Sequence, residues 1–141
     1  MASDSSDFLR SMTIATSGLR AQAGRMRVIS ENIANADSTA STAGGDPYRR
    51  KVPTFTSALD RAADAKVVSL GKIVPDQSAF RVKYDPSNPA ADATGNVKYP
   101  NVNPLIEMTD MRDAQRSYEA NLNVIGATRR MIQRTLDILK T

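Results

Sequence analysis

The chain has 141 residues and a formal net charge of +4, and it contains no Cys, no His and no Trp. Without Cys it has no disulfide framework and no thiolate nucleophile, and without His it lacks the most common general base and transition-metal ligand. The positive charge is spread thinly along the sequence, whereas nucleic-acid-binding proteins concentrate Lys and Arg on one face. We therefore expect no enzyme, no cofactor and no nucleic-acid partner.

The N-terminal third predicts a long helix that ends near Ala36. Apolar side chains recur there in alternating steps of four and three residues, which keeps them on one side of a helix. This stripe consists of Phe8, Met12, Ala15, Leu19, Gln22, Met26, Ile29 and Ile33. Gly18 and Gly24 lie within this predicted helix, and each lowers its stability by about 1 kcal/mol relative to Ala. They either let another backbone approach closely or are tolerated weak points.

The middle of the chain changes character. Residues 37–47 are a loop of small residues, 48–52 are expected to be extended, and 54–65 to be a short helical or irregular stretch. The β-branched run 66–74, the turn residues 75–78 and the alternating run 79–84 predict a β-hairpin. Its apolar face would carry Phe80, Val82 and Tyr84, and would need cover from a helix or a neighbouring subunit. Residues 85–103 are expected to be an extended, structureless connection.

A second long helix is predicted from Pro104 to Lys140. Asn103 can cap it, and Pro104 suits the first helical position. Glu107, Asp110 and Asp113 crowd its start, where the helix dipole favours acids, so we prefer that role to a metal site. Its stripe consists of Met108, Met111, Gln115, Tyr118, Leu122, Ile125, Arg129, Ile132, Leu136 and Leu139.

These elements predict a mainly α protein with a small central β-hairpin and extended linkers. It divides into an N-terminal helix (1–36), a central segment (37–103) and a C-terminal helix (104–141). The two helical ends are expected to lie against each other and against other chains, which indicates an assembly subunit. Polar residues within or beside the stripes, such as Gln22 and Gln115, either fix register or face solvent.

The same stretches resemble a known family. Ser17–Gln22, Arg25–Val28 and above all Glu31-Asn32-Ile33-Ala34-Asn35-Ala36 resemble the N-terminal signature of bacterial flagellar axial proteins. Asn101–Met111, continuing through Ala114–Asn121, is similar to the paired C-terminal signature. The short length and Pro47-Tyr48-Arg49-Arg50-Lys51 resemble the proximal-rod C-type subfamily. Asp37, Gln115 and Asp46 depart from the usual pattern, which puts local contacts in question but not the family.

The resemblance implies that the terminal helices pair as an antiparallel coiled coil and stack into the basal-body rod, which transmits torque. It implies a periplasmic location without membrane insertion, and export without a cleaved signal peptide. The implied partners are copies of the chain, other rod proteins, the adaptor at the rod base, the surrounding membrane ring and the type III export apparatus. A soluble coiled-coil adaptor or export chaperone is the alternative, and a helical nucleic-acid-binding protein is less favoured.

Two sets of contact residues follow. The stripes and signatures predict assembly contacts at Leu19, Gln22, Met26, Ile29, Asn32, Ile33, Asn35, Met108, Met111, Gln115, Tyr118, Asn121, Leu122, Ile125, Ile132 and Leu136. The basic segment and the hairpin face predict lateral contacts at Tyr48, Arg49, Arg50, Lys51, Phe80, Val82 and Tyr84.

Overall fold

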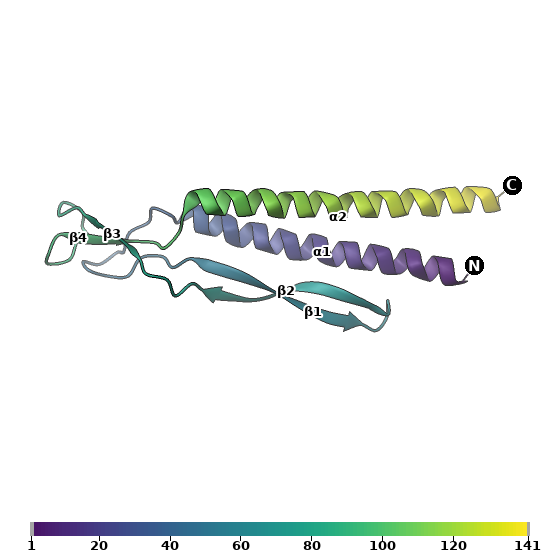
Figure 1. The fold of residues 1–141 in the computed structure, drawn as a ribbon, viewed down its shortest axis with the longest axis horizontal. Coiled ribbons are helices and arrows are strands. Elements are labelled where there is room, and N and C mark those ends of the chain that lie inside the picture. The colour runs from purple at the N-terminus through teal and green to yellow at the C-terminus, as the bar shows by residue number, and fades with distance from the viewer. Residues whose placement is uncertain (1, 141) are drawn as a thin grey trace. The chain divides into compact units, whose positions relative to one another are not determined.

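The computed structural model describes residues 2–140, with side chains from residue 6 onward. The elements follow in the order α1 (Ala2–Ala34), β1 (Lys51–Asp60), β2 (Ala65–Pro75), β3 (Arg81–Tyr84), β4 (Asn96–Tyr99) and α2 (Pro104–Leu139) (Figure 1). The two long terminal helices are thereby confirmed. Two compact units share these elements: unit 1 comprises Met1–Met26, Thr54–Lys72 and Asp113–Thr141, and unit 2 comprises Arg27–Pro53 and Ile73–Arg112.

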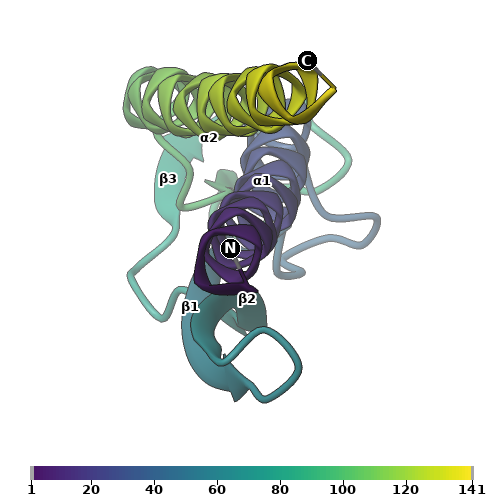
Figure 2. The same ribbon diagram turned by 90° about the vertical axis from the view of Figure 1, so that its right-hand side faces the viewer.

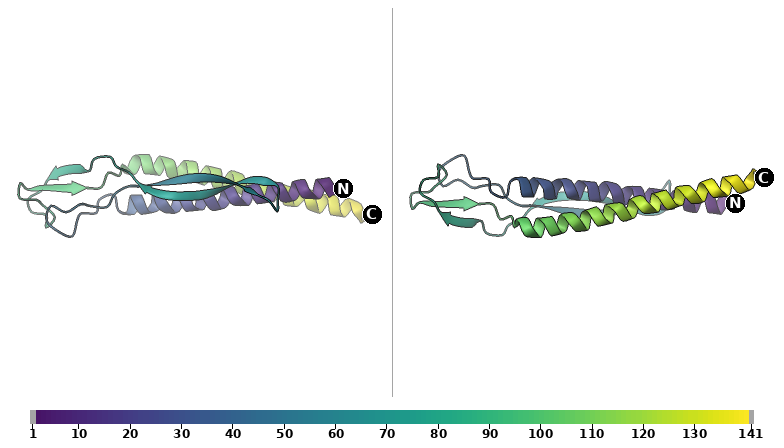
Figure 3. Two further views of the ribbon diagram at one scale, coloured as in Figure 1. Left: turned by 90° about the horizontal axis from the view of Figure 1, so that it is seen from below. Right: turned by 90° about the horizontal axis from the view of Figure 1, so that it is seen from above.

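In unit 1 the helices α1 and α2 lie side by side and run in opposite directions. The Ser11 hydroxyl lies 3.4 Å from that of Thr128. Seven residues further along α1, Gly18 faces Asn121, which is seven residues earlier in α2. The first turns of α1 and the last turns of α2 accordingly lie at the same end of the unit (Figure 3).

The strands β1 and β2 form a two-stranded sheet. The Thr56 and Ser69 hydroxyls are 2.9 Å apart, and the Thr54 hydroxyl donates to the Lys72 carbonyl at 2.6 Å. The connecting turn is held by Asp60, whose Oδ1 accepts the backbone N–H groups of Ala62 and Ala63. These strands therefore form an antiparallel hairpin.

This hairpin packs on α1. The backbone N–H of Val68 donates to the Ser17 hydroxyl at 3.3 Å, and Arg10 Nε donates to the Ala63 carbonyl at 3.1 Å. In unit 1, α1 consequently lies between α2 and the hairpin (Figure 2). A Cβ added to Gly24 would lie 2.8 Å from Leu70 Cδ2, and one added to Gly18 would lie 2.8 Å from Asn121 Nδ2. Both glycines thus stand where another element approaches closely.

Unit 2 contains the second sheet. The strands β3 and β4 are antiparallel, with Arg81 opposite Tyr99 and Tyr84 opposite Asn96. In the loop between them, Asp92 Oδ1 accepts the backbone N–H groups of Thr94 and Asn96, and Gly95 adopts a φ of 81°. The apolar interior of this unit includes Val28, Val97 and Val102, each at most 2% exposed.

The predicted central hairpin is wrong in its pairing. The segment 66–74 pairs with β1 rather than with 79–84, and 54–65 is a strand and a turn rather than a helical stretch. The supposed structureless connection 85–103 supplies β4. The apolar face expected to be covered stays open in the described structure, since Val82 is 62% and Tyr84 69% exposed.

Candidate assembly interface

The side of α1 that faces the protein interior is offset from the predicted stripe. Ala15 and Ile29 are buried as expected, at 3% and 2% exposure, and Gln22 is partly buried. Leu19, Met26 and Ile33 are only partly buried, whereas Gly18 contacts Asn121 and Asn32 is fully buried. Among the residues of α1 with described side chains, the buried ones are Ala15, Ala21, Val28, Ile29 and Asn32, so the buried side includes the residues just before Gln22 and Ile33.

The same offset occurs on α2. Met111, Tyr118, Ile125 and Ile132 are partly buried, but the buried positions between them are Glu107, Ala114 and Thr128. Gln115 is exposed, and Met108, Leu122 and Leu136 are each 52% exposed. The inner seam of α2 thus alternates the partly buried larger side chains with small or polar ones, while other large apolar side chains point outward.

The outward faces of α2 carry an unusual amount of apolar surface. Single exposed apolar residues are normal on proteins, but contiguous patches mark interaction sites. Large apolar side chains more than two-fifths exposed on this helix are Leu105, Ile106, Met108, Leu122, Val124, Met131, Leu136, Ile138 and Leu139. Among the described residues of α1, only Leu9 and Ile14 fall in this class. α2 is therefore the main candidate for contacts with other chains.

A buried polar network in unit 2 is built around Asn32, whose side chain makes four hydrogen bonds. Asn32 Nδ2 donates to the Lys51 carbonyl at 2.8 Å and to Glu107 Oε2 at 3.1 Å. Its Oδ1 accepts the Tyr48 hydroxyl at 2.8 Å and the Lys51 backbone N–H at 2.9 Å. Two donors and two acceptors are the main capacity of a carboxamide, so its burial leaves no polar atom unsatisfied.

Glu107 and Arg50 form the charged part of this network. Arg50 Nε donates to Glu107 Oε1, and Glu107 is 1% exposed. Asp76 and Asp110 lie at 3.5 and 3.8 Å from other nitrogens of the same guanidinium. Burial acts to lower the pKa of Arg50, but the bond and charge of Glu107, with Asp76, raise it overall. The role of Glu107 is thus a buried ion pair, beyond the helix-dipole role predicted from sequence.

The neighbouring side chains of the basic segment are also used within the chain. Burial, followed by the charges of Glu31 and Glu107, raises the pKa of Tyr48 to about 12. Lys51 pairs with Glu31. The Arg49 guanidinium lies 4.2 Å from the centre of the Phe80 ring and donates to the Asp76 carbonyl. These residues were predicted as lateral contacts, and the structure places them in internal contacts of unit 2.

Asn101 is a network residue that the predicted contact set missed. Its Oδ1 accepts the Arg50 backbone N–H at 2.8 Å, and its Nδ2 donates to the Asp76 carbonyl and to Ser78. Asn35, by contrast, is partly buried, and its Nδ2 donates to the Glu31 carbonyl in the last turn of α1. Asn101 is the first residue of the C-terminal signature, which is the only sequence feature that points to it, and that signature does not indicate what its side chain contacts.

No helix among the described residues is long and apolar enough to cross a membrane.

Comparisons with known proteins match both helical ends. The family described as "Flagella basal body rod protein" matches residues 12–40, and "Flagellar basal body rod FlgEFG protein C-terminal" matches residues 93–138. The chain is 56% identical over 127 residues to the flagellar basal-body rod protein FlgC of Agrobacterium fabrum, covering 90% of this chain and 91% of that protein.

More distant relatives give the same result. The FlgC protein of Bacillus subtilis is 40% identical, with 92% of this chain and 97% of the relative covered. That of Aquifex aeolicus is 37% identical, with 95% and 98% covered.

Proposed function

The chain belongs to the family of flagellar basal-body rod proteins FlgC and is a structural subunit of that rod, and we propose that it assembles there through the outward apolar faces of α2. The observation that carries this proposal is the exposure of Met108, Leu122 and Leu136, which we call the Leu122 stripe. They are spaced by fourteen residues and so recur on one side of the helix.

A single chain leaves this stripe in contact with water, which is unfavourable by about 25 cal/mol per Å² of apolar surface. A polymer can repeat the same contact at every subunit, so a modest gain per subunit accumulates along the structure. The inner seam supports the same division of roles, because small or polar residues such as Ala114 and Thr128 occupy alternate positions in it and leave Met108, Leu122 and Leu136 on the outside. The proposed role is structural, with no catalytic step assigned to the chain.

We further propose that α1 and α2 pair as an antiparallel coiled coil. Support comes from the opposite directions of the two helices in unit 1 and from the pairs Ser11–Thr128 and Gly18–Asn121, one heptad apart. The steps of four and three along both inner seams suit knobs-into-holes packing.

The proposed place of the chain is the proximal, periplasmic part of the rod. Its proposed neighbours are copies of itself, other rod proteins, the adaptor at the rod base and the surrounding membrane ring. The proposed route is the type III flagellar export apparatus without a cleaved signal peptide. The support for these finer statements is family membership together with the proximal-type features of the sequence.

Leu122→Asp tests the assembly proposal. Because Leu122 is 52% exposed, the substitution should leave the chain folded and expressed, while a carboxylate buried in a subunit contact costs several kcal/mol. We expect loss of swimming and loss of the chain from purified basal bodies.

Asn123→Asp is the matched control, since it adds the same charge to the next, exposed residue of α2 on a different side of the helix. The control strain should swim. Normal basal bodies containing the Leu122→Asp chain would refute the role of this stripe.

A further inference from the structure

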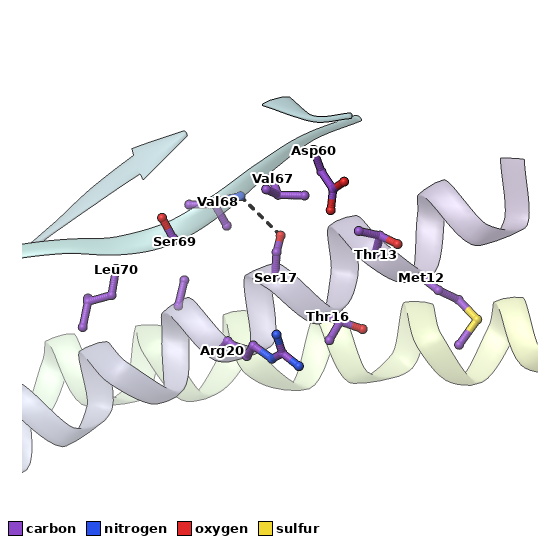
Figure 4. Close-up of a pocket in the computed structure, with 11 residues that line it drawn as sticks. Met12, Thr13, Thr16, Ser17, Arg20, Asp60, Val67, Val68, Ser69 and Leu70 are labelled. Atoms are coloured by element: carbon purple, nitrogen blue, oxygen red, sulfur yellow. Dashed lines mark hydrogen bonds between the residues drawn. The ribbon is translucent and has the colours of Figure 1, made fainter. Parts of the chain in front are cut away.

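Unit 1 contains a groove between α1 and the β1–β2 hairpin, with a volume of about 560 Å³. Met12, Thr16 and Arg20 line it from α1, and Asp60, Val67 and Leu70 line it from the hairpin (Figure 4). The hydrogen bond from the Val68 N–H to the Ser17 hydroxyl ties the two walls together. The groove is therefore a surface of mixed character, in which apolar side chains such as Met12, Val67 and Leu70 lie beside the Arg20 guanidinium and the Asp60 carboxylate.

Asp60 keeps an unused acceptor in this groove. Its Oδ1 accepts two backbone N–H groups of the hairpin turn, but among residues 6–140, whose side chains the structure describes, its Oδ2 accepts no hydrogen bond. A carboxylate in such a place attracts a cation, and Arg is suited to the task because its guanidinium remains charged.

A second stripe on α2 has the matching chemistry. Val124, Ala127, Met131 and Arg134 follow one another in steps of three and four, and we call them the Met131 stripe. Val124 is 44% and Met131 55% exposed. Arg134 is exposed and has no carboxylate partner in the part of the chain that the structure describes. Leu122 and Met131 are nine residues, or about two and a half turns, apart and so point to opposite sides of α2.

We propose that the Met131 stripe of one chain occupies the groove of a second copy, with Arg134 beside Asp60 of that copy. This inference rests on the proposed function and names a partner surface for it. In unit 1, α1 lies between α2 and the hairpin, so a chain cannot place its own Met131 stripe in its own groove (Figure 2). When the stripe of one chain occupies the groove of the next, one groove and one stripe remain free at the two ends. Such a contact generates an open-ended polymer.

The spacing of the Met131 stripe suits insertion into a groove. A helix enters a groove through anchors spaced by three, four and seven residues, as Val124, Ala127 and Met131 are. The small Ala127 permits close approach of the helix backbone, and the flexible Met131 side chain fills an irregular apolar wall.

Engineered cysteines test the contact directly, because the natural chain has none. Full-length chains carrying both Thr16→Cys and Ala127→Cys, incorporated into basal bodies and oxidised, should form a ladder of dimers, trimers and longer products. Chains with only one of the two cysteines should not crosslink to themselves. Double-cysteine chains with Leu105→Cys in place of Ala127→Cys serve as the control and should give no ladder.

Charge substitution is an independent test that needs no crosslinking. Arg134→Asp places two carboxylates together and should reduce the number of rods by about tenfold or more. Adding Asp60→Asn removes this repulsion while the side-chain oxygen can still accept the N–H groups of the turn, so this double charge variant should recover rods towards the natural number.

The outcomes separate this inference from the rod assignment. Three results would each overturn the groove contact and leave the rod role intact. The double-cysteine chain could enter basal bodies without giving a ladder, or a chain with one cysteine could crosslink to itself. The double charge variant could also form no more rods than Arg134→Asp alone. Absence of the natural chain from basal bodies would instead overturn the rod role itself.

Discussion

The carboxamide of Asn32 donates a hydrogen bond to the carboxylate of Glu107 across 75 residues of sequence, with 0% and 1% of the two residues exposed. This bond links the end of α1 to the start of α2 within unit 2. Because Arg50 binds the other oxygen of the same carboxylate, the charge of Glu107 is neutralised inside the protein rather than by water.

Asn32→Asp should destabilise unit 2 strongly. The substitution removes both donated hydrogen bonds and places a second carboxylate beside Glu107, for which we expect a loss of about 2–4 kcal/mol. The amide of Lys51, which donates to Asn32 Oδ1, should exchange its hydrogen faster by the corresponding factor. Asn35→Asp is the control, since the Asn35 side chain is only partly buried. In this variant the hydrogen exchange rate of the Lys51 amide should change little. Equal effects at the two positions would contradict the importance of the network.

Alkaline pH should weaken unit 2 through Tyr48. Folding raises the pKa of this phenol to about 12 from an ordinary value of 10.0, chiefly because of burial. A pKa raised on folding means that the stabilisation is complete below the unfolded value and is lost as pH rises through the folded one. The loss should therefore develop between about pH 10 and 12. Absorbance of tyrosinate should show a late step near pH 12 that disappears in Tyr48→Phe, and persistence of that step would assign it elsewhere.

Two glycine-to-alanine substitutions in the helices should change the melting temperature in opposite directions. Ala is favoured over Gly by about 1 kcal/mol within a helix. A Cβ at Gly126 meets only an Arg130 nitrogen at 3.5 Å, so Gly126→Ala should raise the melting temperature. A Cβ at Gly18 meets Asn121, whose Nδ2 is held by the Ser117 carbonyl, so Gly18→Ala should lower it.

Adding Asn121→Ala to Gly18→Ala removes the clash, and the double variant should recover the lost stability. If Gly18→Ala alone were stabilising, the close approach of the two helices there would be wrong.

The helices are expected to depend on assembly for full order. The helices α1 and α2 contain 33 and 36 residues, respectively. The stability of an isolated helix is marginal without burial, and α2 exposes much of its apolar surface. Circular dichroism of the purified chain should report less helix than these lengths would give. A fully helical, cooperatively unfolding monomer would contradict this expectation.

The long helices could be predicted because their start signals and periodicity are local properties of the sequence. Asn103 does cap α2, its Oδ1 accepting the Leu105 N–H at 3.1 Å. Hydrophobicity predicts only part of the inner seam, such as Ile29 and Ile125. An assembling subunit has inner and outer contacts, and here Gly18, Asn121 and Thr128 face inward while Leu122 and Met131 face outward. An apolar stripe read from the sequence therefore contains some residues of the inner contact and some of the outer contact.

The sheets were mispredicted for a different reason. β1 contains Pro53 and four Thr, Ser or Ala residues among its ten, and its last five residues before Asp60 are all exposed, so it shows no alternation. Its turn has no glycine, and Asp64 takes the positive φ of 45° instead. The residues Pro75–Ser78 resemble a hairpin turn, but the Asp76 carbonyl accepts hydrogen bonds from Arg49 and Asn101. Such long-range partners are not visible in a local pattern.

The position of Asn32 in the sequence also sets an order of events during synthesis. Its partners lie 16, 19 and 75 residues further along the chain, so a polypeptide emerging N-terminus first presents Asn32 long before Glu107 exists. Contacts of such high sequence separation form late and slowly. A chain truncated before residue 107 would retain the heptads of its first helix but could not neutralise Arg50 through Glu107. Synthesis through Glu107, at the start of α2, is therefore required before the buried network of unit 2 can close.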